Sequence, residues 1–326
     1  MKGDFVICTD DDIEELVSRD DMIGDIVAEV EEFFRDKKKG QVVSPPRFTC
    51  EASDGKLVVT AGASERKRLI GLRVYSTFGI KEKDPQVTAV YSMDGSLTGI
   101  FIGETIGRVR TAAINAVAVK HMSRHDSRIL GVIGSGKQAR SVVPYIARMR
   151  QLEKIIVFSL HPEHAKTYIQ GIRDEMNDLG IELSVGETAE KTVSQSDIVL
   201  TVTTSSTPVI RNSWIKPGQH ISCMGRKFRE SHEIEPETVL TSEIVASDSA
   251  QQLKDYGSLF FIDERGRESI YDLSDLIDGG GRKDEDRSLF LSVGLAGTEV
   301  AVAGRILSKI EKEKEAEGAK NFSHAK

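Results

Sequence analysis

Hydrophobic positions repeat at helical spacing near the start of the chain and at strand spacing after it. Ile23, Ile26 and Val30 are three and four residues apart, which predicts the buried face of a helix. Residues 41–105 instead contain short β-branched and aromatic runs separated by glycine, proline and aspartate. This pattern predicts a mostly β segment with a hairpin turn at 93–96.

The pattern changes again after Arg128. Apolar runs such as RILGVIG (128–134), KIIVFSL (154–160) and SDIVLTVTT (196–204) alternate with longer segments of helical periodicity. Near-continuous apolar strands separated by helices are typical of a parallel sheet that is covered on both faces. The sequence therefore predicts an α/β fold with a doubly wound parallel sheet.

Two domains fit a length of 326 residues, because each is then large enough to bury a core of its own. We expect residues 116–304 to form the domain with the parallel sheet, inserted into a smaller α+β domain made of residues 1–115 and 305–326. A helix is predicted from Thr298 to about Glu311. The charged tail that follows this helix is expected to fray into solvent.

A glycine-rich segment, Gly134-x-Gly136-x-x-Ala139, lies where a predicted strand meets a predicted helix. Gly134 permits a tight turn, Gly136 lets the backbone approach a pyrophosphate, and the small Ala139 lets the helix pack close to the strand. The positive end of the helix then stabilises the phosphate charge. Because strand, loop and helix follow in the required order, the segment predicts a Rossmann-type dinucleotide site.

The same segment also matches the first part of a P-loop, Gly131-x-x-x-x-Gly136-Lys137. A P-loop continues with serine or threonine, whose hydroxyl binds Mg²⁺, but Gln138 stands here. We therefore interpret the loop as a dinucleotide site and not as a nucleoside triphosphate site.

The end of the second predicted strand bears on the choice of cofactor. Sites specific for NAD usually carry an acidic residue there, which binds the ribose 2′-hydroxyl. Here the strand ends in Phe158-Ser159-Leu160-His161, none of which is acidic, and no arginine follows directly. We therefore expect NAD(P), with a slight preference for NADP.

Composition narrows the choice of partner and compartment. A formal charge of −7 without a basic block argues against nucleic acid and anionic membranes. No apolar run approaches the roughly 20 residues that span a bilayer. Cys8, Cys50 and Cys223 are far apart and form no C-x-x-C pair, so we expect a reducing cytoplasm. No histidine or acid spacing is typical of a metal site, and none is expected.

Several segments together resemble the ornithine cyclodeaminase/mu-crystallin family. They are Pro46-Arg47, VRTAAINAVAVKHMSR (109–124), LGVIGSGKQA (130–139), SDIVLTVTTSSTPVI (196–210) and LSVGLAGTEVAVA (291–303). The resemblance implies a homodimer with a Rossmann domain that binds NAD(P) and a mostly β domain that binds a small amino or imino acid and dimerises. It implies hydride transfer between amino acids and their keto or imino forms.

The resemblance places Arg47, Arg73 and Arg110 where the family binds the substrate carboxylate. The chemistry agrees, because planar guanidinium groups suit carboxylates. The candidate cofactor residues come from the loop, the strand ends and the resemblance; they are Thr111, Gly134, Ser135, Gly136, Lys137, Gln138, Ala139, Ser159, His161, Thr203, Thr204, Gly225, Val293 and Gly294.

Two positions depart from the family pattern. Arg73 stands where the family has a lysine. The arginine keeps the positive charge but cannot donate a proton near neutral pH. Lys227 replaces the catalytic aspartate of a Gly-x-Asp motif, here Gly225-Arg226-Lys227. Lys227 is the candidate catalytic residue, with a solvated surface lysine as the alternative.

The missing aspartate disfavours ornithine cyclodeamination, which needs a group to take a proton from the substrate amine. Reduction of an imine needs only a hydride, an anchored carboxylate and a proton source. The sequence therefore favours an NAD(P)-dependent imine reductase or amino-acid dehydrogenase. The alternative is a catalytically inactive NAD(P)H-binding sensor or partner subunit.

Overall fold

The computed structural model describes residues 5–78, 86–279 and 282–323, with the backbone alone for 317–323. The chain divides into two compact units. Unit 1 comprises residues 1–110 and 295–326, and unit 2 comprises residues 111–294. The boundaries expected from sequence, at 115/116 and 304/305, fall inside α3, which crosses from unit 1 to unit 2, and α11, which lies within unit 1.

Unit 1 is a sheet with helices. Its helices are α1 (Asp10–Ser18), α2 (Asp20–Lys38), the first residues of α3 (Thr105–Met122) and α11 (Thr298–Ser323), and its strands are β1 (Val6–Thr9), β2 (Val42–Val43), β3 (Phe48–Ala52), β4 (Gly55–Ser64), β5 (Leu69–Ser76), β6 (Val87–Ser92) and β7 (Leu97–Ile102). The strand order is β1-β7-β6-β5-β4-β2, with β3 paired to β4. The predicted β segment is confirmed, and so is the helix with Ile23, Ile26 and Val30 on its buried face.

The two faces of the unit 1 sheet have different surroundings. Side chains alternate in direction along a strand, so Val58, Thr60 and Thr88 are buried on one face while Leu57 and Ile70 are exposed on the other. Helix α11 packs on β4, β5 and β6 and contacts α2. Gly95, at φ +90°, closes the β6–β7 hairpin, as the Asp-Gly pair predicted.

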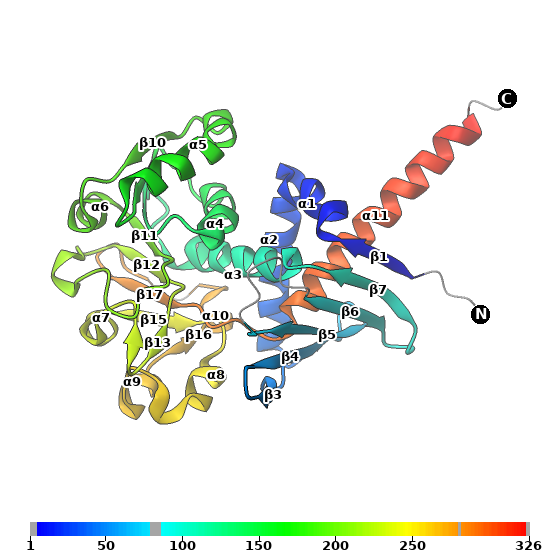
Figure 1. Cartoon of the computed structure of the whole chain (residues 1–326), viewed down its shortest axis with the longest axis horizontal. Coiled ribbons are helices and arrows are strands. Elements are labelled where there is room, and N and C mark those ends of the chain that lie inside the picture. Colours follow the sequence, from blue (N-terminus) through cyan, green and yellow to red (C-terminus); the bar gives the residue numbers. More distant parts are fainter. Residues whose placement is uncertain (1–4, 79–85, 280–281, 324–326) are drawn as a thin grey trace. The chain divides into compact units, whose positions relative to one another are not determined.

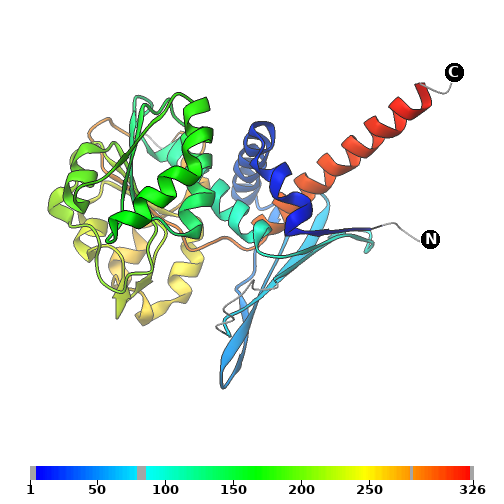
Figure 2. The same cartoon turned by 45° about the horizontal axis from the view of Figure 1, so that its top comes forward.

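Helix α11 is longer than expected. It continues to Ser323, whereas the charged tail after Glu311 was expected to fray. Lys309 forms an ion pair with Glu313 one turn away, and lysine and glutamate are good helix formers. These local preferences extend the helix, whose red C-terminal half continues past the sheet in both views (Figures 1 and 2).

Unit 2 alternates strands and helices. Its strands are β8 (Ile129–Ile133), β9 (Lys154–Phe158), β10 (Glu182–Val185), β11 (Ile198–Thr201), β12 (His220–Cys223), β13 (Lys227–Phe228), β14 (Ser231–His232), β15 (Ile244–Ser247), β16 (Tyr271–Asp272) and β17 (Ser288–Leu291). Its further helices are α4 (Lys137–Ala147), α5 (Pro162–Asp178), α6 (Ala189–Gln195), α7 (Pro236–Thr241), α8 (Ala250–Asp255), α9 (Glu264–Glu268) and α10 (Leu273–Leu276), with short 3₁₀ turns at Asn212–Trp214 and Gly257–Leu259.

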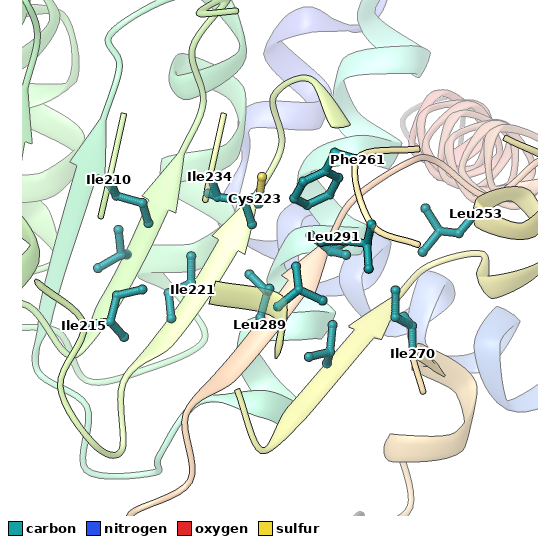
Figure 3. Packing of buried hydrophobic residues seen from close by; sticks show 14 of the residues in the cluster. Ile210, Ile215, Ile221, Cys223, Ile234, Leu253, Phe261, Ile270, Leu289 and Leu291 are labelled. Atoms are coloured by element: carbon teal, nitrogen blue, oxygen red, sulfur yellow. The ribbon is translucent and has the colours of Figure 1, made fainter. Parts of the chain in front are cut away.

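The main sheet of unit 2 has the order β10-β9-β8-β11-β12-β17-β15-β16, and every pairing in it is parallel. Figure 3 shows part of its core, where Ile221, Leu289 and Leu291 project from neighbouring strands into one apolar layer. The sheet is the predicted doubly wound Rossmann type, inserted into the α+β unit. Strand order reverses between β8 and β11, the position at which such sheets bind ligands.

In the part of the chain that the structure describes, no helix combines the length and the apolar character needed to cross a membrane.

Candidate active site

A groove lies at the carboxyl ends of the strands where the order of the unit 2 sheet reverses. Its volume is about 750 Å³. It is lined from β8, β9 and β11 by Ile133, Gly134, Ser135, Gly136, Phe158, Ser159, Leu160, His164, Ala189, Val202, Thr203, Thr204, Ser205, Thr207 and Val209. Six of the cofactor residues predicted from sequence therefore share one cavity: Gly134, Ser135, Gly136, Ser159, Thr203 and Thr204.

The two glycines of the loop are required for different reasons. Gly134 has φ +113°, and a Cβ there would lie 2.5 Å from the Val202 carbonyl oxygen. A side chain at this position would therefore push β8 away from the end of β11. Gly136 instead faces open space, because a Cβ there would have no heavy atom within 4 Å. The space beside Gly136 is available to a ligand.

Gly136 is the N-cap residue of α4, an 11-residue helix. Because glycine has no side chain, it makes no capping hydrogen bond to the first turn of this helix. The first backbone N–H groups of this helix can therefore bind an anion in the groove. Ala139 is fully buried, and its carbonyl accepts a hydrogen bond from the Tyr168 hydroxyl at 3.1 Å. Lys137 and Gln138 are exposed on the first turn and do not line the groove.

The end of β9 forms another wall of the groove. Ser159 and Leu160 line the cavity, and Leu160 is 83% exposed. His161 caps α5, and its ring lies beside Glu163, with Nδ1 and Oε1 3.6 Å apart. His164, and not His161, lines the groove. An acidic residue is thus absent from the groove wall among the residues described.

Glu233 joins the ends of two neighbouring strands. Its side chain is fully buried, and its two oxygens accept hydrogen bonds from the backbone N–H of Thr203 at 2.6 Å and of Gly225 at 2.7 Å. This carboxylate therefore fixes the loops after β11 and β12. Glu233 was not predicted as a site residue, because it lies in a charged stretch, Arg229 to Glu235, that resembles a solvent-exposed loop. Burial raises the pKa of the nearby Cys223 thiol to about 11, which keeps it neutral.

Lys227 lies on β13, next to this pair of loops. It is 5% exposed, and its Nζ donates a hydrogen bond to the Gly225 carbonyl at 2.7 Å. The alternative of a solvated surface lysine is therefore wrong, because the neighbouring Arg226 and not Lys227 carries the exposed charge. The lysine ammonium is held at the carboxyl edge of β12, where a general acid could act.

Val293 and Gly294 follow β17, on the far side of β12. The Asp248 carboxylate, which is fully buried, accepts hydrogen bonds from both backbone N–H groups, at 2.8 and 2.7 Å. Gly294 has φ +87°, which favours glycine. Val293, Gly225 and Thr111 do not line the groove, so the structure leaves them apart from the six residues that do.

Unit 1 carries the predicted substrate arginines. Arg73 on β5 and Arg110 on α3 are 8% and 9% exposed, and both point their guanidinium groups at Glu299 on α11. Arg73 Nη1 lies 3.5 Å and Arg110 Nε 3.3 Å from the same oxygen, Glu299 Oε1. Arg73 also donates through Nε to Gln86 Oε1 at 3.1 Å and stacks over the Tyr75 ring at 4.6 Å. We call Arg73, Arg110, Glu299 and Gln86 the arginine cluster.

Electrostatics in the arginine cluster follow from burial. Burial, and after it the charge of Arg110, lowers the pKa of Arg73 to about 10, so the guanidinium remains cationic at neutral pH. Burial alone raises the pKa of Glu299, but Arg110 and Arg73 outweigh it and hold that pKa below its ordinary value. Arg47 precedes β3, and its positive charge has a smaller effect, in the lowering direction, on the pKa values of both Arg73 and Glu299. The cluster is therefore cationic overall and suits an anion.

The comparisons with known proteins cover nearly the whole chain. Residues 6–314 match the model of the ornithine cyclodeaminase/mu-crystallin family. A Delta(1)-pyrroline-2-carboxylate reductase of Bacillus cereus is 25% identical over 90% of this chain and 93% of its own. An alanine dehydrogenase of Archaeoglobus fulgidus is 28% identical over 91% and 92%. The structure of Thermococcus litoralis Delta(1)-pyrroline-2-carboxylate reductase with NADH and L-proline superposes with a TM-score of 0.82, at 26% identity, over 95% and 98%.

Proposed function

The chain belongs to the ornithine cyclodeaminase/mu-crystallin family, and on that premise we propose that it is an NAD(P)-dependent oxidoreductase that reduces an imino acid, or a keto acid with an amine, to an amino acid, or catalyses the reverse. Relatives named as imino-acid reductases and an alanine dehydrogenase support this class. The reduced nicotinamide supplies a hydride to the imine carbon. The residues of this chain bind the cofactor, hold the carboxylate and provide a proton.

One observation carries the proposal: the buried arginine cluster has more positive than negative charge. In the part of the chain that the structure describes, Arg73 and Arg110 both face one buried carboxylate, Glu299, and the charge of Arg47 also acts on it. A buried excess of cations is costly unless an anion binds there. A substrate carboxylate is such an anion, and a guanidinium group can hold it through two parallel hydrogen bonds.

A spectrophotometric screen at 340 nm tests the proposed function. NADH and NADPH are offered with pyruvate, other 2-keto acids or glyoxylate, each with ammonia or methylamine, and with cyclic imino acids such as pyrroline-2-carboxylate. We expect cofactor oxidation with at least one of these. Binding of the cofactor without oxidation across the panel contradicts the proposal and favours the inactive sensor or partner subunit.

For the cofactor, we propose that both NADH and NADPH are accepted, with NADPH slightly preferred. The wall at the end of β9 presents Ser159, Leu160 and His164 to the groove, and none of these repels a 2′-phosphate. The related structures contain NADH or NAD, which supports a dinucleotide of this kind. The ratio of kcat/KM for the two cofactors, measured in the same screen, decides between them.

Lys227 is proposed as the proton donor to the substrate nitrogen. We expect Lys227→Met to lower kcat by about 10²-fold, the lower range for a lost general acid, while the Kd for NADH stays within about twofold. Arg226→Met, which removes an exposed neighbouring charge, is the matched control and should keep wild-type kcat. An unchanged kcat in Lys227→Met leaves the lysine with only its hydrogen bond to Gly225.

For the oligomeric state, we propose a homodimer formed through the outer face of the unit 1 sheet. Two rows of apolar side chains cross this face, each formed by residues that pair between neighbouring strands. One row is Ile7, Ile100, Ala89, Leu72 and Ala61, and the next is Ile102, Val87, Val74, Val59 and Phe48. Ile7, Ile70 and Phe48 are 57%, 48% and 65% exposed. A contiguous apolar face with exposed side chains is typical of a protein interface. A similar archaeal alanine dehydrogenase is a dimer.

A charge in the middle of this face should separate the two copies. Leu72 lies on the central strand β5, so Leu72→Lys would bury an unpaired ammonium in the dimer. We expect light scattering to change from twice the chain mass of 35.9 kDa to that mass. Val185→Lys, on the exposed edge strand β10 of unit 2, should remain dimeric. A dimeric Leu72→Lys variant contradicts this interface.

A further inference from the structure

The arginine cluster contains one acid that neither the sequence motifs nor the proposed reaction requires. Glu299 lies on the first turn of α11 and is 2% exposed, and its Oε1 faces Arg73 and Arg110 together. Arg73 and Arg110 come from β5 and α3, so three elements converge on one oxygen. A carboxylate placed between two cations reduces their mutual repulsion.

The contact between Glu299 and Arg110 is a contact of charges. Arg110 Nε is 3.3 Å from Oε1 but makes no hydrogen bond, and neither does Glu299 Oε2, in the part of the chain that the structure describes. Arg73 is held by other groups as well, through Gln86 and the Tyr75 ring. A Cβ at Gly107 would lie 2.4 Å from Arg73 Nη2, so this guanidinium also rests against the backbone of α3. Arg110 is thus the partner that depends most on Glu299.

We propose that Glu299 is a positioning residue: its negative charge holds Arg110 against Arg73 in the orientation that binds the substrate carboxylate. This inference rests on the proposed function and adds a residue to it. Arg73 is held by hydrogen bonds to Gln86 and by its ion pair with Glu299, and it supports Arg110 through that shared carboxylate. Arg110 then binds the incoming carboxylate. Substrate affinity, and not the chemical step, should depend on Glu299.

Glu299→Gln tests the proposal because it keeps the shape of the side chain and removes the charge. We expect KM for the carboxylate substrate to rise at least about tenfold, with kcat within about threefold and the Kd for NADH unchanged. Glu299→Asp keeps the charge on a shorter side chain and should restore part of the affinity. Glu313→Gln removes an exposed acid on the same helix, paired with Arg19, and should behave as wild type.

A binding measurement separates this inference from the proposed function. Pyrrole-2-carboxylate, a planar carboxylate that the cofactor cannot reduce, is titrated calorimetrically into wild type and Glu299→Gln with saturating NADH. Weaker binding by the variant supports the positioning role even if wild type turns over no substrate, in which case only the proposed reaction fails. Equal affinity in both proteins, absence of binding by wild type, or a loss of kcat without a change in KM overturns the inference.

Discussion

Replacing Arg110 with alanine is expected to lower kcat/KM for the imino-acid substrate by about 10³-fold or more. Charge-assisted hydrogen bonds contribute about 1.5–3 kcal/mol each, and a bidentate carboxylate contact has two. The substitution also removes one of the two guanidinium groups that face the buried Glu299, so this carboxylate neutralises more of the charge of Arg73. Both effects remove carboxylate affinity. Steady-state kinetics on the substrate found in the screen would measure the loss.

Cofactor binding should survive in Arg110→Ala, because the groove beside Gly136 is lined entirely by residues of unit 2. Fluorescence titration with NADH checks this point, and thermal melting checks the fold. Arg108→Ala is the matched control on the same helix: Arg108 pairs with Glu14 and is expected to have no part in catalysis. Wild-type kcat/KM in Arg110→Ala would remove this arginine from the substrate site.

Replacing Gly136 with valine is expected to weaken NADH and NADPH binding at least about 10²-fold while the protein stays folded. A Cβ at Gly136 meets no protein atom within 4 Å, and its backbone conformation has a negative φ that valine can adopt. The new side chain would therefore occupy the space that a pyrophosphate needs at the start of α4. Titration of the cofactor, together with a melting curve close to that of wild type, would establish the effect.

Two other glycines act as controls for this substitution. Gly24→Val, on the exposed side of α2, also meets no atom within 4 Å and should leave cofactor affinity unchanged. Gly134→Val should instead destabilise the fold, because its Cβ would press on the Val202 carbonyl and φ is +113°. If Gly136→Val binds NADH as tightly as wild type does, the pyrophosphate does not lie beside this residue.

The cofactor loop could be predicted because its determinants are local. The β8 strand, Gly134, Gly136 and the start of α4 lie within about ten residues of one another, and each has a conformational reason to be where it is. The unit 2 sheet was predictable for a similar reason, since apolar strands and amphipathic helices alternate regularly. His161 shows the limit: it follows β9 as expected, but it turns toward Glu163 and His164 lines the groove.

Acids that organise the sites were not predictable in the same way. Glu233 binds the backbone after β11 and β12, and Asp248 binds the backbone after β17. Neither belongs to a local motif, because the N–H groups that each carboxylate satisfies come from distant loops. Buried acids of this kind resemble surface acids in a sequence until the fold shows which backbone donors surround them.

The sequence by itself determined the fold class and the conformation of the glycine-rich loop, because periodicity and short motifs report local conformation directly. The three arginines proposed to bind a carboxylate came from the family resemblance. Only the tertiary structure decided how these charges are arranged. Arg73 and Glu299 are far apart along the chain, yet β5 and α11 bring a guanidinium and a carboxylate within 3.5 Å of each other. The burial that makes this contact strong exists only after both elements have packed, so no spacing in the sequence could reveal it.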